Sequence, residues 1–110
     1  MAAGPKPPST IGQVRDVFPK LGELTDKVVF GDVWERKGLA KRDRSLITVA
    51  SLVTQCATGQ LRGHLWRALD NGVTREEIIE LITHLAFYTG WPNAGSAAEV
   101  AKQVFAERSV

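Results

Sequence analysis

The stretch that most constrains the fold covers residues 59–92 and reads GQLRGHLWRALDNGVTREEIIELITHLAFYTGWP. Apolar residues recur in it at helical spacing, which predicts two helices joined by a tight turn. Thr74 and Glu77 form a capping box, in which the hydroxyl accepts from a first-turn N–H and the carboxylate reaches back. Gly72 and Gly90 suit the left-handed position that ends a helix. We therefore expect a helical hairpin at the centre of the fold.

The flanking segments predict further helices. Residues 11–30 carry apolar side chains at roughly helical spacing, but Pro19 interrupts them, which predicts a turn followed by a helix of about ten residues. Residues 31–44 are expected to form a loop or a broken helix. Pro92 suits the first position of a last helix, which we expect to extend to residue 107.

A chain of 110 residues is expected to form one domain with a modest core. Residues 1–10 (MAAGPKPPST) are proline-rich and lack an apolar period, so we expect a flexible N-terminal arm or one that is docked on a partner. Residues 11–110 would then form a single all-α domain of about five helices.

The segment 45–57 (SLITVASLVTQCA) is apolar on every side of a helical wheel, which predicts a helix that is buried all round. Its β-branched residues would also suit a strand, but its length favours a helix. Four or five helices cannot easily cover it in so short a chain. We infer that another subunit closes one of its faces.

Charge and composition exclude several classes of function. The formal net charge of +2 is too small to indicate a nucleic-acid partner. No apolar run reaches the ~18 residues of a membrane span, and the N-terminus lacks an apolar signal core. A single cysteine, Cys56, excludes an intrachain disulfide and makes a cytoplasmic location the default expectation.

A DNA-binding helix-turn-helix is an alternative interpretation of the central stretch, because Ala68, Gly72 and Ile78 have its spacing. The second helix of that motif must lie against phosphates. The charged residues at its start here are Arg75, Glu76, Glu77 and Glu80. Three carboxylates against one cation have the wrong sign for binding a polyanion, so this interpretation fails.

The two histidines, His64 and His84, lie on the two helices of the central stretch. A single helical histidine is more often a packing or surface residue. Two on adjacent antiparallel helices could face one cavity, which favours a functional role. A zinc site has weak support, because there is no His-x-x-x-His and only one cysteine, so no metal is expected.

Cations cluster before the apolar helix, at Arg36, Lys37, Lys41, Arg42 and Arg44. Several of them fall at the helix start, where the macrodipole disfavours a cation by about 0.3–1 kcal/mol. A solvated positive face is the usual interpretation. A carboxylate-binding site is the other, since arginines beside a helix N-terminus suit an anion, and both remain open.

Three tryptophans, Trp34, Trp66 and Trp91, could wall a pocket, although core packing is the commoner role for each of them. Cys56 ends the apolar helix, and a cysteine there is more often inert and buried than nucleophilic.

Four segments together resemble the carboxymuconolactone decarboxylase family, and the resemblance extends from about residue 18 to residue 105. They are GDVWERKGL (31–39), RSLITVASL (44–52), LRGHLWRALDNGVTREEI (61–78) and HLAFYTGWPNA (84–94). The resemblance implies an alkylhydroperoxidase D-like helical fold, assembled as a homotrimer or homohexamer. It also implies a decarboxylase of a small anionic lactone, 4-carboxymuconolactone or a related acid, that acts in aromatic degradation.

The wider superfamily includes alkylhydroperoxidase D-type reductases, whose site is Cys-x-x-Cys-x-x-x-His with an acidic residue upstream. Aligning that histidine with His64 places Ala57 and Gln60 at the cysteine positions and Ser45 at the acid. Cys56 is one residue out of register. Dithiol peroxidase chemistry is therefore not expected, although a peroxide-handling reductase and a non-catalytic helical oligomer remain the alternatives.

The decarboxylase resemblance implies that no cofactor is needed, because the lactone carbonyl accepts the electron pair left by CO₂. The protein must supply a cation for the carboxylates, donors for the oxyanion and an acid to protonate carbon. From residue chemistry we expect Arg44 to bind a carboxylate or the oxyanion, and His64 to be the acid. We expect His84 to be a second donor, and Asp32 to hold a histidine in one tautomer. The residues expected to bind the substrate are Trp34, Trp91, Tyr88 and Arg42.

Overall fold

The computed structural model describes residues 6–110, and within that range the chain is helical without strands, which confirms the predicted all-α class. The helices are α1 (Thr10–Val14), α2 (Pro19–Leu24), the π-helix η1 (Thr25–Phe30), the 3₁₀-helix η2 (Val33–Glu35), α3 (Lys41–Thr54), α4 (Thr58–Asp70), α5 (Arg75–Thr89) and α6 (Trp91–Arg108).

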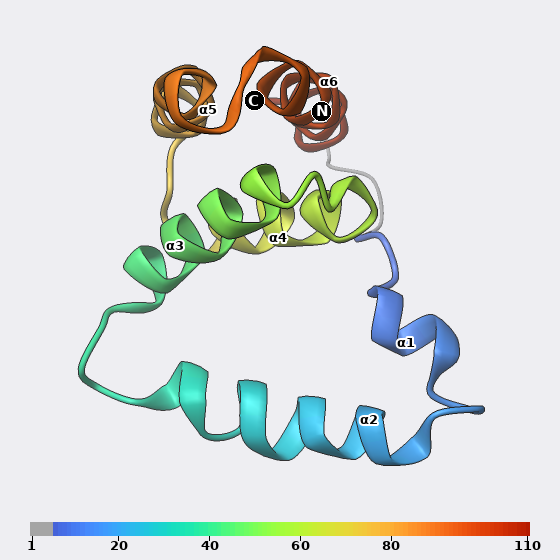
Figure 1. Ribbon diagram of the computed structural model, residues 1–110. Helices are drawn as coiled ribbons and strands as arrows, with labels where there is room; N and C mark the ends of the chain where they lie inside the picture. The colour runs from blue at the N-terminus through green and yellow to red at the C-terminus, as the bar shows by residue number, and fades with distance from the viewer. Residues whose placement is uncertain (1–5) are drawn as a thin grey trace.

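Two layers of paired helices form the body of the molecule (Figure 1). Helix α3 packs beside α4 in one layer, and α5 packs beside α6 in the other. The layers meet mainly where α4 lies against α6 and α3 against α5. The largest fully buried apolar side chains between them are Leu61, Leu65, Ile78, Val49, Val53 and Val104. Burial of this set supplies the main favourable term in folding.

The two helices of the central stretch do not pack as the expected hairpin. Helix α4 packs mainly against α3 and α6, whereas α5 packs mainly against α6 and α3. The connection between them passes from one layer to the other (Figure 1). It is anchored by Val73, which is 2% exposed, and by Asn71, whose side chain donates to Ser45 Oγ at 3.0 Å. These contacts direct α5 away from α4, so the apolar stripe of each helix is buried against α3 and α6 rather than against the other helix of the stretch.

The local signals of that stretch are confirmed. Thr74 Oγ1 accepts from the Glu77 N–H at 3.1 Å, and the Thr74 N–H donates to Glu77 Oε1 at 2.9 Å. Gly72 and Gly90 have φ values of +96° and +94°, which a residue with a Cβ rarely adopts. Helix α6 begins at Trp91, so Pro92 lies in its first turn as expected.

The prediction that residues 45–57 are buried on every side is wrong for a single chain. Helix α3 ends at Thr54 and buries only Ser45, Val49 and Val53, which lie on one face. Ile47 on another face is 58% exposed. Because the α5–α6 layer covers α3 from one side only, a single chain cannot bury the rest. The inference that another subunit closes a second face stays a prediction.

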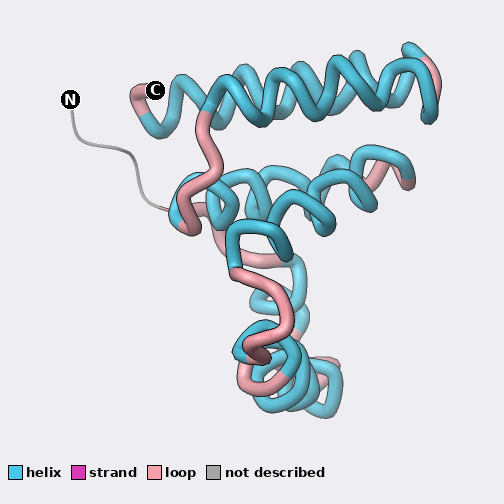
Figure 2. Tube along the Cα trace, turned by 90° about the vertical axis from the view of Figure 1, so that its left-hand side faces the viewer, coloured by secondary structure: helices cyan, strands magenta, loops and turns pink. Residues whose placement is uncertain are grey.

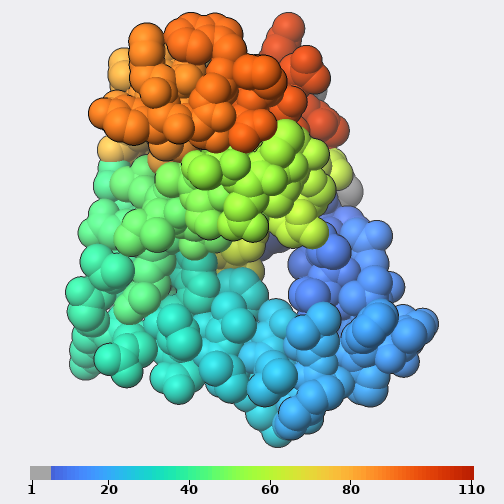
Figure 3. Space-filling model, viewed as in Figure 1, coloured from blue at the N-terminus to red at the C-terminus, as the bar shows by residue number. Residues whose placement is uncertain are grey.

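The residues before α3 form a separate helical leg (residues 10–35) that extends from the α3–α4 layer (Figures 1 and 2). Pro19 starts α2 and η1 continues it without a break, which confirms the helix expected after this proline. The space-filling view shows an open gap between the leg and the body (Figure 3). The exposed apolar side chains of the leg include Val17, Phe18, Leu21, Leu24, Val28 and Val29.

Half of the expected flexible arm, residues 1–5, lies outside the described residues. Residues 6–9 have no regular secondary structure, and Ser9 caps α1 by accepting from the Gly12 N–H at 2.9 Å.

Candidate functional site

A cavity of about 400 Å³ lies between the helical leg and α4, and residues 6–9 also line it. We call it the His64 cavity. The charged and aromatic residues that line it are Lys6, Arg15, Asp26, Phe30, His64 and Arg67. They come from residues 6–15, from η1 and from α4, so the cavity exists only because the leg folds back beneath α4.

His64 enters this cavity from the middle of α4. Its ring is stacked with that of Trp34, with centroids 6.4 Å apart. Its Nδ1 is buried and has no hydrogen-bond partner among the described residues. Burial lowers the pKa of His64, and the positive charges of Arg67 and Lys6 lower it further. The free imidazole is therefore mainly neutral at pH 7, and the hydrogen-bonding capacity of its Nδ1 is not used by any described residue.

Arg67 lies three residues after His64 and therefore on the same face of α4. Its guanidinium carbon is 4.0 Å from the centroid of the Phe30 ring and 5.6 Å from that of Trp34. Burial lowers its pKa and the charge of Asp70 partly offsets this, and an arginine remains charged in a protein. No hydrogen bond or ion pair joins this guanidinium to another residue in the range 6–110, because nearby Asp70 binds Arg108 at 2.9 Å. A cation without an acidic partner thus lines the cavity.

Arg67 was not among the residues predicted from the sequence. Its helical spacing from His64 was the available signal, but three residues along a helix also separate many surface cations from a histidine. Only the leg, by placing Phe30 over the guanidinium, distinguishes Arg67 from these.

The π-helix η1 shapes the cavity from the side of the leg. It carries Asp26 and Phe30, which both line the cavity. A Cβ added at Gly31, which follows η1, would lie 2.6 Å from the Asp26 carbonyl oxygen, so this turn requires glycine. π-Helical turns occur frequently at functional sites. Here the turn sets the position of the ring that contacts Arg67.

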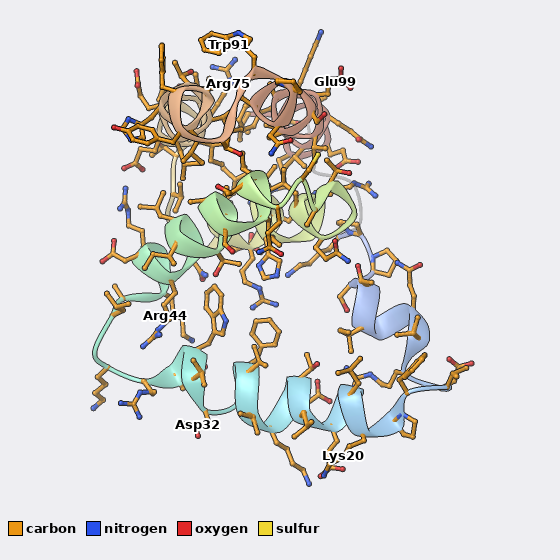
Figure 4. All side chains as sticks on the ribbon, in the orientation of Figure 1. Lys20, Asp32, Arg44, Arg75, Trp91 and Glu99 are labelled. Carbon is orange, nitrogen blue, oxygen red and sulfur yellow. The ribbon has the colours of Figure 1, made fainter. Side chains whose placement is uncertain are left out.

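Arg44 lies in the second turn of α3 and points into the space between α3 and η2 (Figure 4). Its Nη2 donates to the Arg36 carbonyl at 3.0 Å, whereas its Nε is buried without a partner. Arg44 Nε and His64 Nδ1 are the two buried side-chain nitrogen or oxygen atoms that lack a hydrogen bond within residues 6–110. Such atoms are rare in native proteins and call for an explanation. Both belong to residues that the sequence predicted to be catalytic.

Asp32 and Arg42 are placed differently from this pair. Asp32 is exposed, and Figure 4 shows its side chain pointing away from the body, so in one chain it does not orient a histidine. Arg42 forms an ion pair with Glu77 and thereby links α3 to α5. Its charge is already partnered.

His84, Tyr88 and Trp91 lie outside the His64 cavity. His84 is exposed, stacks on Tyr88 with centroids 4.9 Å apart, and lines a different groove beside Leu46. Trp91 is 64% exposed at the far side of the molecule from the leg (Figure 4). Within one chain the two histidines therefore do not share a cavity, and Trp34 and Trp91 do not wall one ring. A site that contained both histidines would take them from different chains.

Cys56 is exposed and has a φ of +55°, so the expectation that it is buried is wrong. It lies in the tight turn between α3 and α4, where little covers it. Within the described range, no group of three or more His, Cys, Asp or Glu side chains is placed to hold a metal ion. No helix there is long and apolar enough to cross a membrane.

Comparisons with known proteins agree on one family. The model of the carboxymuconolactone decarboxylase family matches residues 19–103. The 4-carboxymuconolactone decarboxylase of Acinetobacter baylyi is 38% identical over 101 residues, which cover 92% of this chain and 75% of that protein.

Two further relatives match over a shorter range. The nitrosuccinic acid decarboxylase of Metarhizium robertsii is 38% identical over 81 residues, which cover 74% of this chain and 57% of that enzyme. An uncharacterized 15.0 kDa protein of Paracoccus denitrificans is 36% identical over 80 residues, which cover 71% of this chain and 60% of that protein. The chain thus spans less than two thirds of the length of these two relatives.

Proposed function

Because the chain belongs to the carboxymuconolactone decarboxylase family, we propose that it is a cofactor-independent decarboxylase of a small anionic lactone, 4-carboxymuconolactone or a related acid. The products would be an enol-lactone and CO₂. Two of its relatives are named as decarboxylases of small acids, which supports this class of reaction.

The chemistry needs no external electron acceptor. The bond between the ring carbon and its carboxylate breaks, CO₂ leaves, and the electron pair delocalises through the double bond onto the lactone carbonyl. A proton then adds to carbon and gives the product. The protein must bind the carboxylates, stabilise the negative charge on oxygen and donate the proton; removing one oxyanion donor typically costs about 2.7–4 kcal/mol of transition-state stabilisation.

We assign the proton transfer to His64. His64 lines a cavity beside a cation without an ion-pair partner, and its buried Nδ1 makes no hydrogen bond to a described residue; this is the observation that carries the proposal. The low pKa of the free ring does not prevent this role, because a bound anion favours the charged imidazolium and raises the pKa again. Substrate binding would therefore recruit a proton from solvent to His64.

Arg44 keeps its proposed role as a donor to a carboxylate or to the oxyanion. Its unpartnered Nε supports this role, but Arg44 does not line the His64 cavity, so it would have to reach the substrate from outside that lining. His84, Tyr88 and Trp91 can contribute only if another chain brings them to the cavity, and the same holds for Asp32. We propose self-association as a homotrimer or homohexamer. The exposed apolar side chains of the helical leg and of the α5–α6 junction support it, and light scattering after size exclusion measures it.

The test is CO₂ release and loss of lactone absorbance with 4-carboxymuconolactone, on protein treated with a chelator. We expect turnover in the wild type and about a 10²- to 10⁴-fold lower kcat in His64→Gln, the range for loss of a general acid. Lys102→Gln, an exposed change on α6, is the control. Full turnover in His64→Gln would contradict the assignment of this residue.

The same assay separates the alternatives. A non-catalytic oligomer predicts no turnover that depends on His64 or Arg44. A dithiol reductase lacks support, because Ala57 and Gln60 occupy the cysteine positions.

A further inference from the structure

The charges around the His64 cavity are paired with one exception. Arg15 binds Asp26 at 2.6 Å, and Lys6 lies 3.9 Å from Asp70. Arg67 has no acidic partner among the described residues, although it lines the same cavity. The wall therefore carries one positive charge that forms no direct ion pair with a described carboxylate, next to a histidine whose buried nitrogen is also unpartnered; Asp70 acts on Arg67 only through space.

We propose that Arg67 is the residue that binds a carboxylate of the ligand in this cavity, and that Phe30 holds its guanidinium in position to do so. This inference rests on the proposed function for the position of the site and the acidic nature of its ligand. It goes further by assigning the anion to a residue that neither the family resemblance nor the cation cluster of α3 identified.

The aromatic contacts explain how Arg67 would be oriented. A guanidinium is planar, and its N–H groups point outward in that plane. With Phe30 4.0 Å away, one face of the group is covered, while the N–H edge remains available for a bidentate carboxylate. Trp34 lies 5.6 Å from the guanidinium and also stacks with His64. One indole thus contacts both the anion-binding group and the proton-transferring group.

Other arginines are less suited to this role. Arg15 and Arg42 already bind carboxylates, from Asp26 and Glu77. Arg44 donates to a backbone carbonyl and is not among the residues that line the cavity. Arg67 is half-buried, and a partly desolvated cation without a direct partner costs free energy, so its retention is explained when a ligand completes the pair.

The test uses succinate, a small dicarboxylate that this chemistry cannot decarboxylate, with the full chain in its native association state. Calorimetry measures the affinity, and NMR follows the titration of the His64 ring. We expect wild-type protein to bind succinate and the His64 pKa to rise on binding. Arg67→Met should weaken binding about 10- to 100-fold, the range for a hydrogen bond to a charged group. Arg67→Lys should recover part of it, because it keeps the charge and loses the fork.

Arg75→Met is the matched control, because its guanidinium also lies over an aromatic ring, 5.3 Å from the Phe105 centroid, but in another groove. It should bind succinate as the wild type does. Arg44→Met distinguishes Arg67 from Arg44 as the residue that binds succinate, and we expect it to weaken binding less than Arg67→Met does. Circular dichroism checks that each variant is folded, and if Arg67→Met is not, the comparison of Arg67→Lys with wild type decides.

Several results would overturn the proposal: no succinate binding by the wild type, unchanged affinity in the Arg67 variants, or an equal loss in Arg75→Met. Loss in Arg44→Met alone would do the same. The proposed function fails separately. If succinate binds through Arg67 but no lactone releases CO₂, the decarboxylase proposal is wrong and the anion site stands. If turnover depends on His64 but not on Arg67, the decarboxylase proposal stands and the assignment of the anion to Arg67 is wrong.

Discussion

Trp34 is expected to fasten the helical leg to the body, and Trp34→Ala should release it. Apart from Gly22, it is the one residue of the leg that is buried. Its ring contacts Phe30 within the leg, with centroids 5.7 Å apart, and His64 and Arg67 on α4. Removing it deletes the main apolar contact between the leg and the layers above.

The magnitude follows from these contacts. Truncating a buried tryptophan typically costs about 3–5 kcal/mol. Here the loss includes an aromatic pair, about 0.5–1.5 kcal/mol, and a cation–π contact, about 0.5–1 kcal/mol. Trp34 is buried but is not part of the apolar cluster of α3–α6, so we expect most of this cost in the docking of the leg rather than in global unfolding.

Hydrogen exchange read by mass spectrometry measures this difference by segment. A loss of about 3–5 kcal/mol corresponds to amide exchange about 10²- to 10⁴-fold faster in residues 19–30, up to the limit of full opening. Peptides from α4 and α6 should keep their protection. Trp91→Ala is the matched control, because Trp91 is 64% exposed, and it should leave exchange in the leg unchanged.

Two results would refute this reasoning. Unchanged exchange in residues 19–30 of Trp34→Ala would show that other contacts hold the leg. Equal acceleration in α4 and α6 would show that leg and body unfold together. All samples must have the same protomer concentration, because self-association contributes to apparent stability.

Three further predictions concern pH, a helix cap and the π-helix. The pKa of His64 is lowered in the folded chain, so below pH 6.5 the unfolded chain binds more protons than the folded chain. The free energy of unfolding should therefore fall as the pH is lowered toward the folded-state pKa. Urea titrations at several pH values should show a weaker pH dependence of this free energy in His64→Gln. Thr74→Ala removes the acceptor of the α5 capping box and should cost about 1 kcal/mol in the same urea assay, with Thr83→Ala, an exposed change within α5, as the comparison. Gly31→Ala would place a Cβ 2.6 Å from a backbone oxygen of η1, so it should lower the melting temperature and, by displacing Phe30, weaken succinate binding. Gly38→Ala is the control: its Cβ would meet no atom within 4 Å, so neither the melting temperature nor succinate binding should change.

The sequence alone determined the features of this protein that depend on neighbouring residues. Apolar spacing predicted the helices, the Thr74–Glu77 pair predicted the α5 cap, and the two glycines were placed where φ is positive. These signals are readable because hydrogen bonds and steric limits act within one or two turns of chain. The family was also recognisable, since its motifs are contiguous segments.

Tertiary structure decided which helix packs on which, and which side chains meet. The spacing of apolar residues in α4 and α5 shows that each helix has an apolar face, but it does not say which helix covers that face. The two helices were expected to pair with each other, whereas in the structure they lie in different layers. In the same way, nothing in the sequence distinguishes Arg67 from a surface cation on a helix; its contact with Phe30, which comes from a distant segment, is seen only in the folded chain. Sequence spacing describes one helix at a time, whereas burial and charge pairing are set by contacts between segments that only the folded chain brings together.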